Sequence, residues 1–232
     1  MRLTERHVAA IMREIPDPGF NYGPEVRPST DEDHARHAAR IIDASPPEGL
    51  WVFAYGSLIW KPAFDFVEQR VGIVRGWHRA FCLGWDRRFR GNAEQPGLML
   101  ALDHGGQCTG VLFRLPPDTL AANVDSLVRR EMGMVPSSFP PRWVNVATAG
   151  GPVRALTFAI DRKSGRYVSG LSDAQLADVL ATACGARGSM AEYLFATVAH
   201  LQQLDIHDRY LWRLQEMVAE RIERAHGVTA DK

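Results

Sequence analysis

Hydrophobic positions divide the chain into a helical start, a strand-rich middle and a helical end. At the start, Thr4 precedes a short segment of mixed polarity, and Thr30 precedes the acidic residues 31–33. A Ser or Thr followed by acidic side chains is typical of a helix N-terminus, where the helix dipole is positive. We therefore expect one short helix after Thr4. We expect a second from Ser29 or Thr30 to about Ala44.

The middle of the chain predicts strands. Short apolar runs lie between turn residues, and a helix is expected among them from Pro117 to Glu131. The pairs Gly105-Gly106 and Gly150-Gly151 predict hairpin turns. Six or seven short strands with tight turns favour a small barrel or a strongly curved sheet. The expected strands are 51–55, 70–74, 77–83, 98–102, 109–115, 142–147 and 153–160.

The end of the chain predicts helices. One is expected from Ser172, and Ser189 with Glu192 three places later fits a capping box that starts another. Asp208 is a candidate cap for the last helix, whose apolar face repeats at helical spacing. The fold class is therefore α+β, with helices that flank a small barrel or a strongly curved sheet. We expect residues 1–48 to form a helical extension that ends in a proline-rich linker.

Composition excludes several classes of partner. The 232 residues carry 27 basic and 27 acidic side chains, so the net charge is zero and indicates neither nucleic acid nor a membrane surface as a partner. No stretch approaches the roughly 20 apolar residues that a membrane helix needs, and the N-terminus lacks the apolar run of a signal peptide. We expect a cytoplasmic protein. The oligomeric state stays open.

Metal and cofactor chemistry is not indicated. Cys82, Cys108 and Cys184 are far apart and form no C-x-x-C pair, so they predict small buried apolar side chains in a reducing compartment. The eight histidines form no H-E-x-x-H spacing. We therefore expect no metal and no cofactor.

The turn Tyr55-Gly56-Ser57-Leu58 follows an apolar strand and is the first candidate for chemistry. Glycine allows a sharp bend and a close approach of a ligand to the backbone. Successive N–H groups in such a turn can form a nest that binds an anion, and a carboxylate suits it. The plain alternative is a turn that simply ends a strand.

Glu131 is the second candidate. Leu120, Val124, Leu127 and Val128 form the apolar face of the expected helix, and Glu131 lies on the same stripe near its C-terminal end. Burial and the negative end of the helix dipole would both raise its pKa. A glutamate with a raised pKa suits proton transfer near neutral pH. The structural alternative is an ion pair with a neighbouring or remote arginine, such as Arg129 or Arg130.

The chain from about Trp51 to Arg224 resembles the ChaC-like γ-glutamylcyclotransferases. The resemblance rests on several motifs that occur in the family's order and at its approximate spacing. They are WVFAYGSLIW (51–60), GWHRAFCLG (76–84), QPGLMLAL (95–102), GVLFRLP (110–116), RREM (129–132) and AEYLF (191–195). Ala54 departs from the pattern, because many relatives have glycine there.

The resemblance implies a small mixed β-barrel of the γ-glutamylcyclotransferase type, with flanking helices, in a domain of residues 49–226. It implies that Tyr55, Gly56, Ser57 and Leu58 bind the γ-glutamyl end of the substrate and that Glu131 is the catalytic acid/base. Tyr193 would help to line the pocket. The expected reaction is intramolecular aminolysis of glutathione, which yields 5-oxoproline and cysteinylglycine. Residues 1–48 lie outside the resemblance, so we expect a protein without its first 44 residues to fold and stay active.

Two alternatives remain open from the sequence. A cyclotransferase that acts on other γ-glutamyl amino acids or amines would have the same turn and the same glutamate. A non-catalytic regulatory protein on this fold would not need the acid, which is present here as Glu131. A panel of γ-glutamyl substrates distinguishes these readings.

Overall fold

The computed structural model describes residues 1–20 and 22–228 of the chain. The chain forms two compact units. The barrel unit comprises Tyr22–Ala80 and Ala101–Gly165, and the helical unit contains Phe81–Leu100 together with residues from both ends of the chain.

The barrel unit is built around a closed barrel of five strands in the order β2-β4-β3-β6-β7. The β2 strand pairs antiparallel with β4 and parallel with β7, so the barrel is mixed, as predicted. Buried side chains such as Val52, Leu112 and Val146 fill it. The strands are β2 (Trp51–Ala54), β3 (Glu68–Asp86), β4 (Gly97–Arg114), β6 (Pro141–Thr148) and β7 (Gly151–Phe158).

Two strands are longer than expected. The segments predicted around 70–74 and 77–83 are parts of the single strand β3, and those around 98–102 and 109–115 are parts of β4. The prediction of a hairpin turn at Gly105-Gly106 is therefore wrong. Both glycines lie inside β4 at positive φ, which lets the strand bend without ending. The turn at Gly150-Gly151 is confirmed, because Thr148 pairs with Gly151 across the hairpin.

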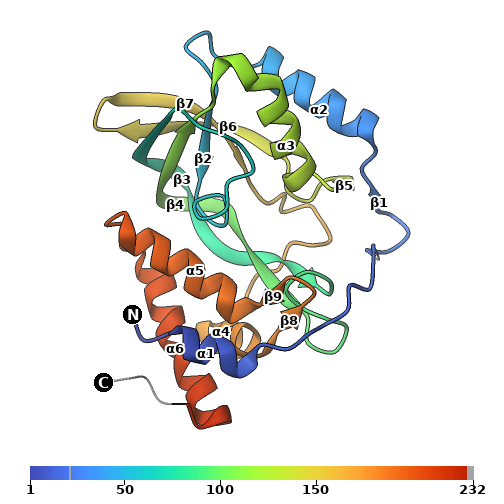
Figure 1. Cartoon of the computed structure of the whole chain (residues 1–232), viewed down its shortest axis with the longest axis vertical. Helices are drawn as coiled ribbons and strands as arrows, with labels where there is room; N and C mark the ends of the chain where they lie inside the picture. The colour runs from blue at the N-terminus through green and yellow to red at the C-terminus, as the bar shows by residue number, and fades with distance from the viewer. Residues whose placement is uncertain (21, 229–232) are drawn as a thin grey trace. The chain divides into compact units, whose positions relative to one another are not determined.

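Helices α2 (Asp31–Asp43) and α3 (Leu120–Glu131) also belong to the barrel unit and pack side by side (Figure 1). Thr30 caps α2 by accepting the N–H of Asp33, which confirms the predicted start. The 3₁₀ turn Pro117–Thr119 leads into α3 at the predicted place. The short strands β1 (Arg27–Pro28) and β5 (Met134–Val135) pair antiparallel.

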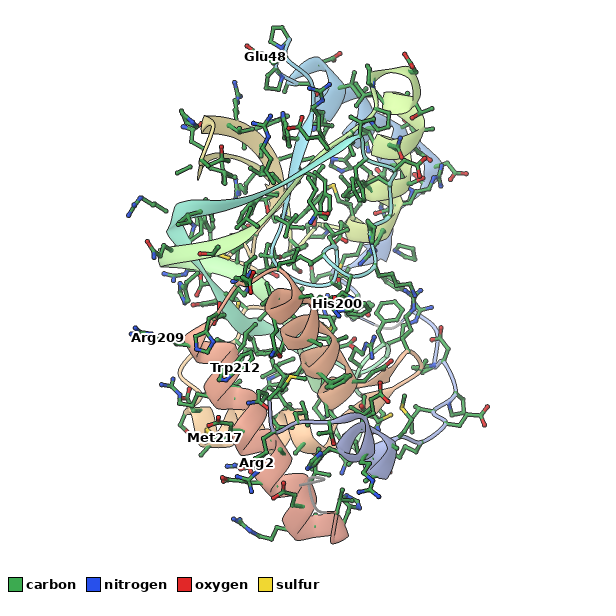
Figure 2. All side chains as sticks on the ribbon, turned by 60° about the vertical axis from the view of Figure 1, so that its left-hand side comes forward. Arg2, Glu48, His200, Arg209, Trp212 and Met217 are labelled. Carbon is green, nitrogen blue, oxygen red and sulfur yellow. The ribbon has the colours of Figure 1, made fainter. Side chains whose placement is uncertain are left out.

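The helical unit contains α1 (Glu5–Ile11), α4 (Asp173–Thr182), α5 (Met190–Gln203), α6 (Arg209–His226) and the short pair β8 (Cys184–Gly185) and β9 (Gly188–Ser189). Ser172 and Ser189 accept cap hydrogen bonds, and Asp208 caps α6, as predicted. The apolar face of α6 is buried. Arg2 lies beside α6 and pairs with Glu220 and Glu223 (Figure 2).

The N-terminal segment contributes to both units. Helix α1 packs against α5 and α6, whereas α2 packs against α3. The compact units therefore do not follow the boundary expected at residue 48, and the division into 1–48 and 49–226 stays a prediction.

Candidate functional site

The Tyr55–Leu58 turn follows directly after β2. The N–H of Ile59 donates to the Gly56 carbonyl at 2.9 Å, and the N–H of Lys61 donates to the Ser57 carbonyl at 2.8 Å. The side chains of Tyr55 and Leu58 are buried, and Ser57 is half-buried. Two successive hydrogen-bonded turns therefore fix the backbone here.

Glycine in β4 brings the barrel close to this turn. A Cβ at Gly110 would lie 2.5 Å from the carbonyl oxygen of Ala54 and 2.7 Å from the ring of Phe53. Such distances are too short for a side chain, so Gly110 lets β4 lie directly against the end of β2. This contact fixes the position of Ala54, the residue just before Tyr55.

Three backbone amides of the turn have no protein partner. In the described part of the chain, the N–H groups of Gly56, Ser57 and Leu58 donate to no protein acceptor. Three successive amides without a protein partner are a feature of backbone anion sites. The turn can therefore donate to an anionic group.

Glu131 is the last residue of α3 and lies on its apolar face, as predicted. Val124, Leu127 and Val128 on that face are fully buried, and the Glu131 side chain is 15% exposed. Burial raises the pKa of Glu131 above the ordinary carboxyl value, and the Arg130 guanidinium offsets part of this rise. The net direction is upward, which leaves a carboxyl group able to take and give a proton.

Arg130 connects Glu131 with the turn. Its Nε lies 3.1 Å from Oε1 of Glu131, and its Nη2 donates to Oγ of Ser57 at 2.9 Å. Its Nη1 donates to the carbonyl of Lys61. The ion pair that the structural alternative required is therefore present. The same guanidinium also brings the predicted acid and the predicted binding turn into one site.

Two further residues hold the site, and the sequence analysis missed them. Asn123 on α3 accepts the N–H of Asp65 at 2.8 Å and so ties the segment after the turn to the helix. Arg79 is buried and donates from Nε to the carbonyl of Tyr55 at 2.6 Å. The sequence contains a signal for both. Asn123 is a polar residue next to the apolar Val124, and Arg79 lies within an apolar strand, so each needs a hydrogen-bond partner when it is buried.

Tyr193 lies on α5 in the helical unit. Its buried ring packs edge-to-face on Phe81 at 6.3 Å between centroids, and the guanidinium of Arg90 lies 5.7 Å from the ring centre. These contacts account for its burial within that unit. A role in the substrate pocket stays a prediction.

Within the described part of the chain, no group of three or more His, Cys, Asp or Glu side chains could hold a metal ion. None of the helices in that part of the chain is long and apolar enough to cross a membrane. The three cysteines are buried, as predicted.

Several known proteins are similar to this chain in sequence or in fold. A glutathione-specific γ-glutamylcyclotransferase of Escherichia coli K12 is 40% identical over 179 residues, which are 76% of each chain. A glutathione-specific γ-glutamylcyclotransferase 1 of Danio rerio is 31% identical over 72% of this chain and 87% of its own. The crystal structure of a yeast γ-glutamylcyclotransferase specific to glutathione covers 74% of this chain and 96% of its own, with a TM-score of 0.67 and 21% identity.

The predicted fold class is confirmed by this structural likeness together with the closed barrel. The family of ChaC-like proteins matches residues 50–221, which include the Tyr55–Leu58 turn and Glu131. The chain belongs to the ChaC-like protein family.

Proposed function

We propose that this protein is a γ-glutamylcyclotransferase that acts on glutathione and releases 5-oxoproline and cysteinylglycine. The observation that carries the proposal is the pairing of a largely buried Glu131 with the Tyr55–Leu58 turn through Arg130. The names of the relatives support the substrate. The proposed location is the cytoplasm, where thiols are kept reduced, and the buried cysteines fit it.

The reaction uses a nucleophile that the substrate carries. The α-amine of the glutamyl residue attacks the γ-amide carbonyl carbon, and a new C–N bond closes a five-membered ring. The bond between that carbon and the cysteinyl nitrogen then breaks. Because nucleophile and electrophile share one molecule, holding the substrate folded back supplies much of the rate advantage.

Glu131 is proposed to move the protons. An α-ammonium group has a typical pKa near ~8, so it must lose a proton before it attacks. The Glu131 carboxylate accepts this proton and then gives one to the departing cysteinyl nitrogen. The raised pKa of Glu131 brings its proton affinity closer to that of the amine, which eases both transfers.

The turn is proposed to hold the α-carboxylate of the glutamyl residue. The amides of Gly56, Ser57 and Leu58 are the donors, and Arg130 next to them adds a positive charge. Tyr193 is proposed as a further contact of the pocket, and residues 49–226 as the catalytic domain. No metal and no cofactor takes part in these steps.

Product analysis tests the proposal. Pure protein incubated with glutathione should release 5-oxoproline and cysteinylglycine in equal amounts, measured by mass spectrometry. γ-Glutamyl amino acids and amines in the same assay test the wider substrate class. An analogue without the glutamyl α-carboxylate should have a much higher KM. Release of glutamate in place of 5-oxoproline would identify a hydrolase and reject the proposal.

Arg130 gives a prediction about pH. Its guanidinium lowers the pKa of Glu131, so Arg130→Met should raise that pKa further. The carboxylate would then form at higher pH, and the acidic limb of the kcat profile should move upward. The loss of the contact with Ser57 should also raise KM by about tenfold, the value of a charge-assisted hydrogen bond.

Arg130→Lys separates the two effects. Lysine keeps the charge, so the acidic limb should stay near the wild-type position. A single ammonium cannot match the fork that reaches Glu131, Ser57 and Lys61 together, so the rise in KM should remain. An unchanged pH profile in Arg130→Met would show that the charge does not act on Glu131.

A further inference from the structure

The C-terminal end of α3 is held by residues that lie outside the part of the chain matched by the family. The match begins at residue 50, whereas these contacts come from residues 27–34, which we call the N-terminal brace. Figure 1 shows α3 next to β1 and β5. The brace and α3 both belong to the barrel unit.

Ser29 bonds to both residues that follow Glu131. Its Oγ donates to the carbonyl of Met132 at 2.7 Å, and its N–H donates to the carbonyl of Gly133 at 3.1 Å. The adjoining β1–β5 pair, Pro28 with Met134, continues this contact along the backbone. Ser29 thus holds the carbonyls of the two residues that follow Glu131.

His34 is a second donor to the same carbonyl. Its Nε2 lies 3.2 Å from the oxygen of Met132, and because a carbonyl accepts, this nitrogen carries the hydrogen. The ring is buried, and its Nδ1 has no partner among the described residues. Among the described residues, the ring of His34 therefore makes one hydrogen bond. Its partner is Met132, the residue next to Glu131.

The brace is itself anchored. Asp33 accepts the backbone N–H of Thr30 at 3.0 Å and pairs with Arg27. These bonds fix the first turn of α2 and therefore the position of His34. A pair between Arg129 and Asp31 links the same elements, but both side chains are exposed, so it adds little.

Helix ends need such partners. The last carbonyls of a helix accept no hydrogen bond from an N–H group of the helix itself. A last turn without other donors therefore frays. Glu131 stands in this last turn, so a movement of the turn would displace its carboxyl group. A displacement of about 1 Å at a reacting group can lower turnover about 100-fold.

We propose that Ser29 and His34 are positioning residues for Glu131, acting through the carbonyl of Met132. The proposal rests on the proposed role of Glu131. It assigns to the N-terminal segment a part in catalysis, although no atom of that segment is required to touch the substrate.

The decisive variant combines Ser29→Ala with His34→Leu, which removes both donors and keeps most of the volume. We expect kcat with glutathione to fall about 10- to 100-fold and KM to change less than about threefold, because the turn is untouched. Amide hydrogen exchange of a peptide covering 129–135 should become faster. His34→Gln places an amide donor near the ring nitrogen and should keep kcat within about threefold of wild type.

Ser45→Ala is the matched control. Ser45 also lies in the N-terminal segment, and its Oγ donates to the carbonyl of Ile41 at 2.8 Å, at the other end of α2. It should lower the melting temperature as a lost hydrogen bond does and leave kcat unchanged. A melting curve for every variant separates turnover from folding.

Two results would overturn the proposal. One is wild-type kcat and wild-type hydrogen exchange in the double variant. The other is an equal loss of kcat in His34→Gln and His34→Leu, which would show that the donor does not matter. Glu131→Gln is measured alongside. If that variant is as active as wild type, the acid/base role fails as well, and the exchange data alone decide whether the brace holds the segment.

Discussion

Glu131→Gln should lose about 100- to 10,000-fold in kcat with glutathione, the usual contribution of a general acid/base group. Glutamine keeps the volume and the planar shape of the side chain but cannot accept the ammonium proton. KM should change little, because the amides of the turn and Arg130 remain in place. Steady-state kinetics with quantified 5-oxoproline measures both constants.

The same substitution should not destabilise the fold near neutral pH. Burial raises the pKa of Glu131, so the folded protein binds its proton more tightly than the unfolded chain does. Over the interval between the ordinary carboxyl pKa and the raised one, the folded state holds more protons, and stability falls as pH rises. Glutamine does not titrate. The melting temperature of the variant relative to wild type should therefore rise with pH across this interval.

Glu68→Gln is the control for the chemical change itself. Glu68 lies in the barrel unit and pairs with Arg70 and Arg114. All three side chains are partly exposed. This variant should show wild-type turnover and at most a small loss of stability. If Glu131 serves only as the partner of Arg130, Glu131→Gln should instead lower the melting temperature and keep its turnover per folded molecule. One mutant measured in both ways thus separates catalysis from structure.

Local signals in the sequence predict the elements well. Thr30, Ser172 and Asp208 cap helices where their side chains indicated, since a cap involves neighbours in the chain. The buried stripe that contains Glu131 is also a local pattern. Strand ends were harder, because Gly105-Gly106 can make a turn or a bend within a strand, and the pairing with distant strands decides.

The candidate site is predictable in part. The turn and the acid each carry a short motif, so both can be proposed from the sequence. The bonds that join them, from Arg130 to Ser57 and from Asn123 to Asp65, connect residues 73 and 58 positions apart. Such contacts depend on how α3 lies against the barrel and leave no spacing rule in the sequence. The brace belongs to the same class, because Ser29 and Met132 are 103 positions apart.

Deletion of residues 1–44 should prevent cooperative folding, contrary to the expectation from the sequence. Leu3 and Ile11 are buried in the helical unit, and Ile41 is buried in the barrel unit. Loss of one buried Leu or Ile side chain costs about 2–5 kcal/mol. Three such losses reach the range of about 5–15 kcal/mol that stabilises a typical domain. Soluble yield and a thermal melt followed by circular dichroism measure the outcome.

A shorter deletion locates the cause. Removal of residues 1–14 takes away α1 and the N–H groups of Arg2 and Leu3, which donate to Oε1 of the fully buried Gln215. This leaves a buried amide without its partners, so the melting temperature should fall strongly. The brace stays present in this variant, so kcat per folded molecule should remain near wild type below the melting transition. If the protein without residues 1–44 melts cooperatively at the wild-type temperature, the buried contacts of the N-terminal segment do not stabilise the fold, and the extension is expendable after all.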